Sequence, residues 1–127
     1  MNKKVLVTGG RGLVGTAIKQ VSTKFPNLDF VFTDRRFHDL TKEQDIEKMF
    51  AKHKPDYVIH TAARVGGIGK NLNSPAQQYY DNILMNTYMI HHAHLNNVEK
   101  LIAFSSVCAF PAECKMLSEE SLHDGAP

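Results

Sequence analysis

The chain has 127 residues, a length that allows one domain, and 43% of them are apolar, which is enough for a hydrophobic core. A formal net charge of +2 does not favour nucleic acid or an anionic membrane surface, and no apolar run reaches the length of a membrane span. Two cysteines, Cys108 and Cys114, make neither a disulfide framework nor a zinc motif, a usage that suits the cytoplasm.

The chain opens with an apolar run followed by a cluster of glycines. The run Val5-Leu6-Val7 predicts a strand buried on both faces, and a helix is predicted from Leu13 to about Lys24. Between them the glycines match both G-x-G-x-x-G and G-x-x-G-x-x-G, a pattern that allows a tight turn, close approach to a pyrophosphate and close helix packing. We therefore predict dinucleotide binding by the residues of this turn: Gly9, Gly10, Arg11, Gly12, Leu13, Val14 and Gly15.

Strands and helices alternate along the rest of the chain. Further strands are predicted at residues 30–32, 57–63 and 101–104, with a glycine-rich loop at 65–68 and a loop after residue 110. Two further helices are predicted, one with a capping box of Thr41 and Gln44 and the other with a capping box of Ser74 and Gln77. This alternation predicts an α/β fold with a parallel sheet and right-handed crossovers.

Unusual residues gather where the predicted strands end. They occupy positions 9–15, 34–36, 62–67 and 105–108. Because ligands of parallel sheets bind at the carboxyl ends of the strands, we expect these segments to form one site.

The choice of dinucleotide depends on the end of the second predicted strand. Asp34 is at the position that normally accepts hydrogen bonds from the adenosine ribose of NAD. Arg35, Arg36 and Arg11 favour the 2′-phosphate of NADP, because guanidinium groups pair with phosphate oxygens. The arginines favour NADP over NAD, a preference that the family resemblance described below strengthens. Asp39-Leu40 is expected near the adenine edge, and the alternative is a plain entry into the next helix.

Several motifs together resemble the extended short-chain dehydrogenase/reductase superfamily and, within it, the GDP-L-fucose synthases. The superfamily resemblance rests on Thr8-Gly-Gly-Arg-Gly-Leu-Val-Gly15 and His60-Thr-Ala-Ala63. The closer resemblance rests on Ala62-Ala-Arg-Val-Gly-Gly67, Asn82, Lys100-Leu-Ile-Ala-Phe-Ser-Ser-Val-Cys108 and the Phe110-Pro111 that follows.

The resemblance implies a function and a division of the chain. It implies an NADP-dependent enzyme that epimerises and reduces a GDP-4-keto-6-deoxy-sugar, and a homodimer at full length. It also implies a Rossmann-type parallel sheet with helices on both faces, incomplete at its C-terminal end. Residues 1–110 would bind NADP, with Ala62, Ala63 and Asn82 among the contacts, and residues 111–127 would lead toward a missing catalytic and substrate region. None of the four tyrosines has a lysine four residues later, so we expect this chain alone to be inactive.

Two candidate catalytic residues follow the last predicted strand. By the resemblance, Ser106 would hydrogen-bond the keto oxygen being reduced and Cys108 would act as the base in epimerisation. Val107 departs from the serine or threonine usual between them. From residue type alone, a serine at a strand end is more often a cap and a buried cysteine more often inert.

Other residues carry simpler predictions. No carboxylate or cysteine accompanies His91, His92 and His94 at ligand spacing, so we predict no metal site. His60 is interpreted as a satisfied core histidine, Tyr79-Tyr80 as core packing, and Cys114 receives no role.

Overall fold

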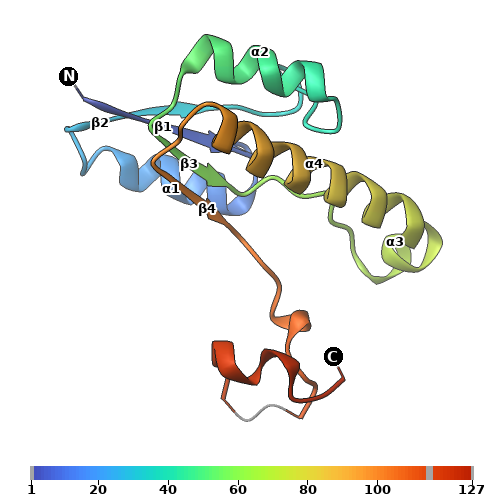
Figure 1. Ribbon diagram of the computed structural model, residues 1–127. Coiled ribbons are helices and arrows are strands. Elements are labelled where there is room, and N and C mark those ends of the chain that lie inside the picture. The colour runs from blue at the N-terminus through green and yellow to red at the C-terminus, as the bar shows by residue number, and fades with distance from the viewer. Residues whose placement is uncertain (1, 114–115, 127) are drawn as a thin grey trace.

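The computed structural model describes residues 2–113 and 116–126 and contains a four-stranded sheet with helices on both faces (Figure 1). The strands are β1 (Lys3–Thr8), β2 (Leu28–Phe32), β3 (Tyr57–His60) and β4 (Lys100–Ala103). The helices are α1 (Leu13–Ser22), α2 (Glu43–His53), α3 (Ile68–Asn73) and α4 (Pro75–Leu95), and two short 3₁₀ helices follow, η1 (Val107–Ala109) and η2 (Glu119–His123).

The sheet is parallel throughout, with the strand order β2-β1-β3-β4. Val5 of β1 is paired with Phe30 on one side and with Tyr57 on the other. The predicted α/β class and parallel sheet are therefore confirmed. The chain moves from β1 to β2 in one direction and from β2 to β3 in the other, so the order of strands reverses at β1.

This reversal decides which helix covers which face. Right-handed crossovers place α1 on one face and both α2 and α4 on the other (Figure 1). On the α1 face, Lys19 lies over the ring of Phe32, 6.0 Å from its centroid. The core fills the opposite layer, between the sheet and α2 and α4, and consists of Leu6, Leu40, Ile46, Met49, Phe50, Val58, Met85, Met89 and Ala93.

Neither predicted capping box is formed. The residue that precedes α2 is Lys42, and the Thr41 hydroxyl donates to Asp39 instead of accepting from the first turn of the helix. Ser74 precedes α4 as predicted, but its side chain makes no capping hydrogen bond. Gln77 donates its amide hydrogen to Asp81, one turn along the same helix, because that carboxylate lies within its reach.

Three further expectations differ from the structure. β3 ends at His60, three residues before the predicted end, and the predicted loop at 65–68 leads into the extra helix α3. The segment after residue 110, expected to be a loop, includes η2 with a capping box of Ser118 and Ser121. Tyr79 and Tyr80 are 71% and 58% exposed, so the prediction that they pack in the core is wrong. The buried face of α4 carries Asp81, Met85 and Met89 instead.

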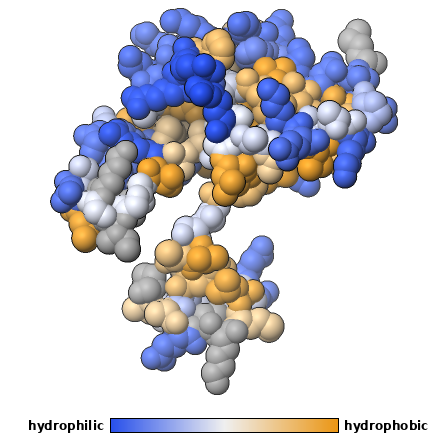
Figure 2. All heavy atoms as spheres, turned by 180° about the vertical axis from the view of Figure 1, so that it is seen from behind, coloured by the Kyte–Doolittle hydropathy of each residue, from blue (hydrophilic) through white to orange (hydrophobic). Residues whose placement is uncertain are grey.

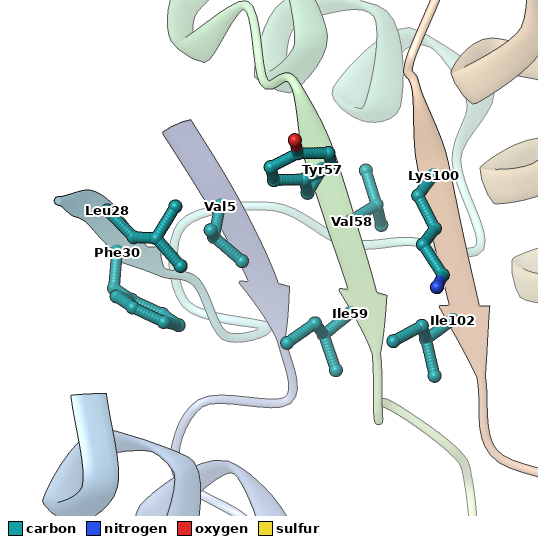
Figure 3. A pocket seen from close by; sticks show the side chains of 8 residues that line it. All are labelled: Val5, Leu28, Phe30, Tyr57, Val58, Ile59, Lys100 and Ile102. Atoms are coloured by element: carbon teal, nitrogen blue, oxygen red, sulfur yellow. The ribbon is translucent and has the colours of Figure 1, made fainter. Parts of the chain in front are cut away.

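Much of the α1 face of the sheet remains open. Side chains from all four strands border a depression of about 290 Å³ there, among them Val5, Phe30, Ile59 and Ile102 (Figure 3). In the view from behind, patches of hydrophobic surface lie among the hydrophilic surface of the part that contains the sheet. Hydrophobic surface also covers much of the C-terminal segment below it (Figure 2). In the part of the chain that the structure describes, no helix is long and apolar enough to cross a membrane.

Candidate functional site

A cleft of about 540 Å³ lies at the carboxyl ends of β1, β2 and β3, beside the point where the strand order reverses. Its walls come from the glycine turn, from the segments that follow β2 and β3, and from α4. The lining residues are Gly9, Arg11, Gly12, Leu13, Val14, Thr33, Asp34, Arg35, His38, Asp39, Leu40, Thr41, Thr61, Ala62, Ala63, Arg64, Val65, Asp81 and Met85. The expected convergence of the strand ends is therefore present for three of the four strands.

Backbone geometry explains the glycines of the first turn. Gly9 has a φ of +68°, and a side chain there would also collide with Thr61 and Ala62 at the end of β3. Gly15 lies in the first turn of α1, where a Cβ would collide with the backbone of Gly9 and come within 2.7 Å of the Cα of Gly10. Gly15 therefore allows close packing of α1, as predicted, and it does not line the cleft.

The amino end of α1 opens onto this cleft. Gly12 precedes the helix and accepts its first hydrogen bond, from the Thr16 amide at 2.9 Å. The amides of the first turn therefore have no partner within the helix, and the helix dipole places partial positive charge there. Leu13 is 90% exposed and Val14 lines the cleft beside it. This arrangement fits an anionic group such as a pyrophosphate.

Asp34, just after β2, is held by its neighbour Arg36. Arg36 donates from Nε to Oδ1 at 3.0 Å and from Nη2 to Oδ2 at 2.8 Å, and its backbone amide donates to Oδ1 at 2.9 Å. These contacts lower the pKa of Asp34 from 3.8 to about 2, since each of them favours the carboxylate. Arg36 itself does not line the cleft.

The other two arginines predicted to select the cofactor do line the cleft. Arg35 has a side chain that is 76% exposed and makes a loose ion pair with Asp39 at 3.6 Å, whereas Arg11 belongs to the glycine turn. Partial burial raises the pKa of Asp39, but hydrogen bonds from Thr41 and the charge of Arg35 outweigh it, so the pKa is lowered overall. Leu40 lines the cleft next to Asp39, as its predicted position requires.

The segment after β3 is fixed by two neighbouring residues of α4. Asn82 accepts a hydrogen bond from the Arg64 amide at 2.7 Å and donates one to the Arg64 carbonyl oxygen at 2.9 Å. Asp81 forms an ion pair with the Arg64 guanidinium, and this contact lowers the pKa of Asp81. Asn82 does not line the cleft, so it positions the wall that Ala62, Ala63 and Arg64 form.

A buried histidine joins the ends of β1 and β3 below the cleft. His60 is 3% exposed, and its ring nitrogens pair with the hydroxyl of Thr8 at 2.7 Å and with the side-chain oxygen of Asn86 at 3.1 Å. Burial lowers the pKa of His60, so the ring is neutral at pH 7. The prediction of a satisfied core histidine is confirmed.

Ser106 and Cys108 lie beyond β4 and are exposed. The Ser106 hydroxyl accepts a hydrogen bond from the Cys108 amide at 3.2 Å, which begins η1. Neither residue lines the cleft, so their catalytic roles stay predictions. Cys114 lies outside the described residues.

The structure brings carboxylates to one of the three helical histidines. His92 of α4 is 5% exposed, and its Nε2 lies 3.3 Å from Oε1 of Glu43, with Glu47 alongside. No carboxylate lies near this histidine at ligand spacing in the sequence, but the fold brings two close to it, so the expectation is wrong for His92. Both glutamates are exposed, and the contact joins α2 to α4 next to Phe50, so we interpret it as an interhelical hydrogen bond.

Sequence reasoning missed several residues of the cleft. Thr61 and Met85 line it, together with His38. Thr61 was placed inside the third predicted strand, which in fact ends at His60, whereas Met85 reaches the cleft through the packing of α4. Thr33 also borders the cleft, and its buried hydroxyl has no hydrogen-bond partner within the described part of the chain.

Comparisons with known proteins agree with this geometry. A probable GDP-L-fucose synthase of Drosophila melanogaster is 37% identical, and the match covers 98% of this chain and 40% of the fly protein. A solved GDP-L-fucose synthetase from Naegleria fowleri bound to NADP has a TM-score of 0.87 and 36% identity, covering 98% of this chain and 41% of that one. MlghC, a GDP-mannoheptose C4 reductase from Campylobacter jejuni with NADP bound, has a TM-score of 0.88 and 34% identity, covering 98% and 37%.

These matches cover nearly all of this chain but less than half of each relative. The chain spans about two fifths of the length of the curated relatives it matches first. The sequence model of the NAD dependent epimerase/dehydratase family matches residues 5–127. This range includes every residue that lines the cleft. With its parallel sheet and glycine turn, the chain belongs to the NAD dependent epimerase/dehydratase family.

Proposed function

We propose that this chain is the NADP-binding portion of an epimerase/reductase that acts on a GDP-4-keto-6-deoxy-sugar, of the GDP-L-fucose synthase type. The observation that carries the proposal is the cleft itself, where Arg11 and Arg35 line the wall near the amino end of α1. In this proposal residues 1–110 bind the cofactor and residues 111–127 lead toward the catalytic and substrate region of a longer protein. The greater length of the matched relatives supports this division.

Each wall of the cleft would hold a different part of the cofactor. The amides at the start of α1 would bind the pyrophosphate, and Arg11 and Arg35 would bind the 2′-phosphate. Asp39 and Leu40 would border the adenine. When bound, NADPH supplies the hydride for reduction.

Ser106 and Cys108 would serve the sugar. Both emerge where β4 ends, and β4 lies next to β3, whose end forms a wall of the cleft. Ser106 would donate a hydrogen bond to the keto oxygen, and the Cys108 thiolate would remove a proton next to the ketone. The hydrogen bond between the two residues keeps them close together.

Titration calorimetry with NADP and NAD tests the cofactor. We expect NADP to bind more tightly, and Arg35→Ala to remove most of the difference, since a hydrogen bond to a charged group contributes about 1.5–3 kcal/mol. Lys24→Ala, which removes an exposed cation outside the cleft, is the matched control and should leave the preference unchanged. Equal affinity for NAD and NADP in the wild type would contradict the proposal.

A second assay tests turnover. With GDP-4-keto-6-deoxy-mannose present, we expect this chain to produce neither NADPH oxidation nor solvent deuterium uptake, because it lacks the Tyr-x-x-x-Lys pair of the family. Loss of a general acid alone costs about 10²–10⁴-fold. A full-length GDP-L-fucose synthase provides the positive control. Substrate-dependent oxidation by this chain would refute the proposed incompleteness.

Two alternatives remain open to experiment. The similarity to MlghC favours a GDP-keto-heptose as a second candidate substrate. The other alternative is a module that binds NADP but catalyses no reaction. It predicts tight NADP binding and no turnover of either sugar nucleotide, even when the chain is joined to the catalytic region of a relative.

A further inference from the structure

We propose that Arg36 makes the site selective for the phosphorylated cofactor by neutralising Asp34, and not by contacting the phosphate. This inference rests on the proposed function, since it concerns how the cleft distinguishes NADP from NAD. It assigns different roles to three neighbouring charges that the sequence alone treats as one cluster: Asp34, Arg35 and Arg36.

Asp34 occupies the position that opposes phosphate binding. It follows β2 directly and lines the cleft, with a side chain that is 15% exposed. A free carboxylate there would accept hydrogen bonds from the ribose hydroxyls of NAD and would repel a 2′-phosphate. A site that takes NADP must therefore remove the free charge of this carboxylate or keep its oxygens occupied.

Arg36 does both. Its guanidinium covers the two carboxylate oxygens through Nε at 3.0 Å and Nη2 at 2.8 Å, and its amide adds a third hydrogen bond at 2.9 Å. This bidentate geometry is the strongest form of a carboxylate–guanidinium contact. The oxygens that would receive ribose hydroxyls are already engaged, and the net charge of the pair is zero.

The position of Arg36 separates it from the other arginines. It does not line the cleft, whereas Arg35 and Arg11 do. Its guanidinium carbon lies over the ring of Phe37, 5.5 Å from the ring centroid, a favourable cation–π contact. Among the described residues, Arg35 makes one ion pair, the loose 3.6 Å contact with Asp39, so its guanidinium can turn toward a phosphate.

A rescue experiment tests this division of roles on the intact chain. Titration calorimetry measures NADP and NAD affinities for the wild type and for Arg36→Ala, Asp34→Asn and the double variant. We expect Arg36→Ala to reduce the ratio of NADP to NAD affinity by about tenfold or more, because it exposes the Asp34 charge. The double variant should recover the wild-type ratio, since no carboxylate is left to neutralise, and Asp34→Asn alone should keep it.

The outcomes separate this inference from the proposed function. If Arg36→Ala leaves the ratio unchanged, or if Asp34→Asn fails to rescue it, Arg36 is either irrelevant or a direct phosphate ligand, and the inference is overturned. If the wild type itself shows no preference for NADP, the proposed function fails first. The ratio compares two ligands on one preparation, so a partly unfolded variant does not distort it, and circular dichroism checks the fold.

Discussion

Gly15→Ala provides a direct test of how closely α1 packs on the strand. In an ordinary helix this change stabilises the protein by about 0.4–1 kcal/mol, because alanine restricts the unfolded chain. Here the added Cβ would collide with the Gly9 carbonyl oxygen and lie 2.7 Å from the Gly10 Cα and 2.9 Å from the Gly9 carbonyl carbon. All three atoms belong to the backbone, so no side chain can move aside.

The magnitude follows from comparing the two effects. Overpacking a tight site costs about 1–3 kcal/mol, which exceeds the usual gain. We therefore expect a net loss of ~1–2 kcal/mol and a fall in Tm of ~5 °C, together with weaker NADP binding as the first turn of α1 shifts.

Gly69→Ala is the matched control for this experiment. Gly69 lies in α3, and a Cβ there would meet no atom within 4 Å, so the usual stabilisation should appear. Thermal unfolding followed by circular dichroism measures both variants. If Gly15→Ala melts at or above the wild-type temperature, the close approach of α1 does not constrain the fold and the reasoning is refuted.

Three further predictions concern stability and association. Burial lowers the pKa of His60 below its ordinary 6.5, so the unfolded chain binds more protons and stability should fall as pH drops below ~6.5, by at most about 1.4 kcal/mol per pH unit. A plot of unfolding free energy against pH, measured by urea unfolding between pH 5 and 8, should be flatter for His60→Gln than for the wild type, and equal slopes would contradict this. Phe50→Ala should cost ~3–5 kcal/mol in urea unfolding because Phe50 is fully buried, whereas exposed Phe37→Ala should change little, and similar losses would refute the core assignment. The open sheet face should cause self-association in sedimentation velocity, reduced by Ile102→Glu, and a monodisperse wild-type monomer would argue against it.

Features carried by a single stretch of chain were predictable from the sequence. The glycine turn could be predicted from the positions of Gly9 and Gly15 between an apolar run and a helix. The backbone geometry there depends on the absence of Cβ atoms. The alternation of strands and helices likewise implied a parallel sheet. His60 was recognisable as a core residue because it lies in an apolar strand.

Features that depend on competing partners were not predictable. The Thr41 hydroxyl could accept from the backbone amides that begin α2 or donate to the carboxylate of Asp39. It donates to Asp39 and does not cap the helix. Arg35 and Arg36 are adjacent in sequence, and only three-dimensional geometry shows that Arg36 holds Asp34. The contact between His92 and Glu43 joins residues 49 positions apart, which no local pattern indicates.

Two residues of α4 contact Arg64, and they control different properties of the loop: one fixes its backbone and the other binds its charged side chain. Asn82 binds only the main chain of residue 64, which every amino acid except proline offers in the same form. Asp81 binds the guanidinium, which only arginine offers. Evolution could therefore replace the side chain at position 64, and with it the charge presented to a ligand, while the wall of the cleft kept its path. A change at position 82 would have the opposite result: the same charge would remain, on a loop that has lost both of its main-chain hydrogen bonds to α4.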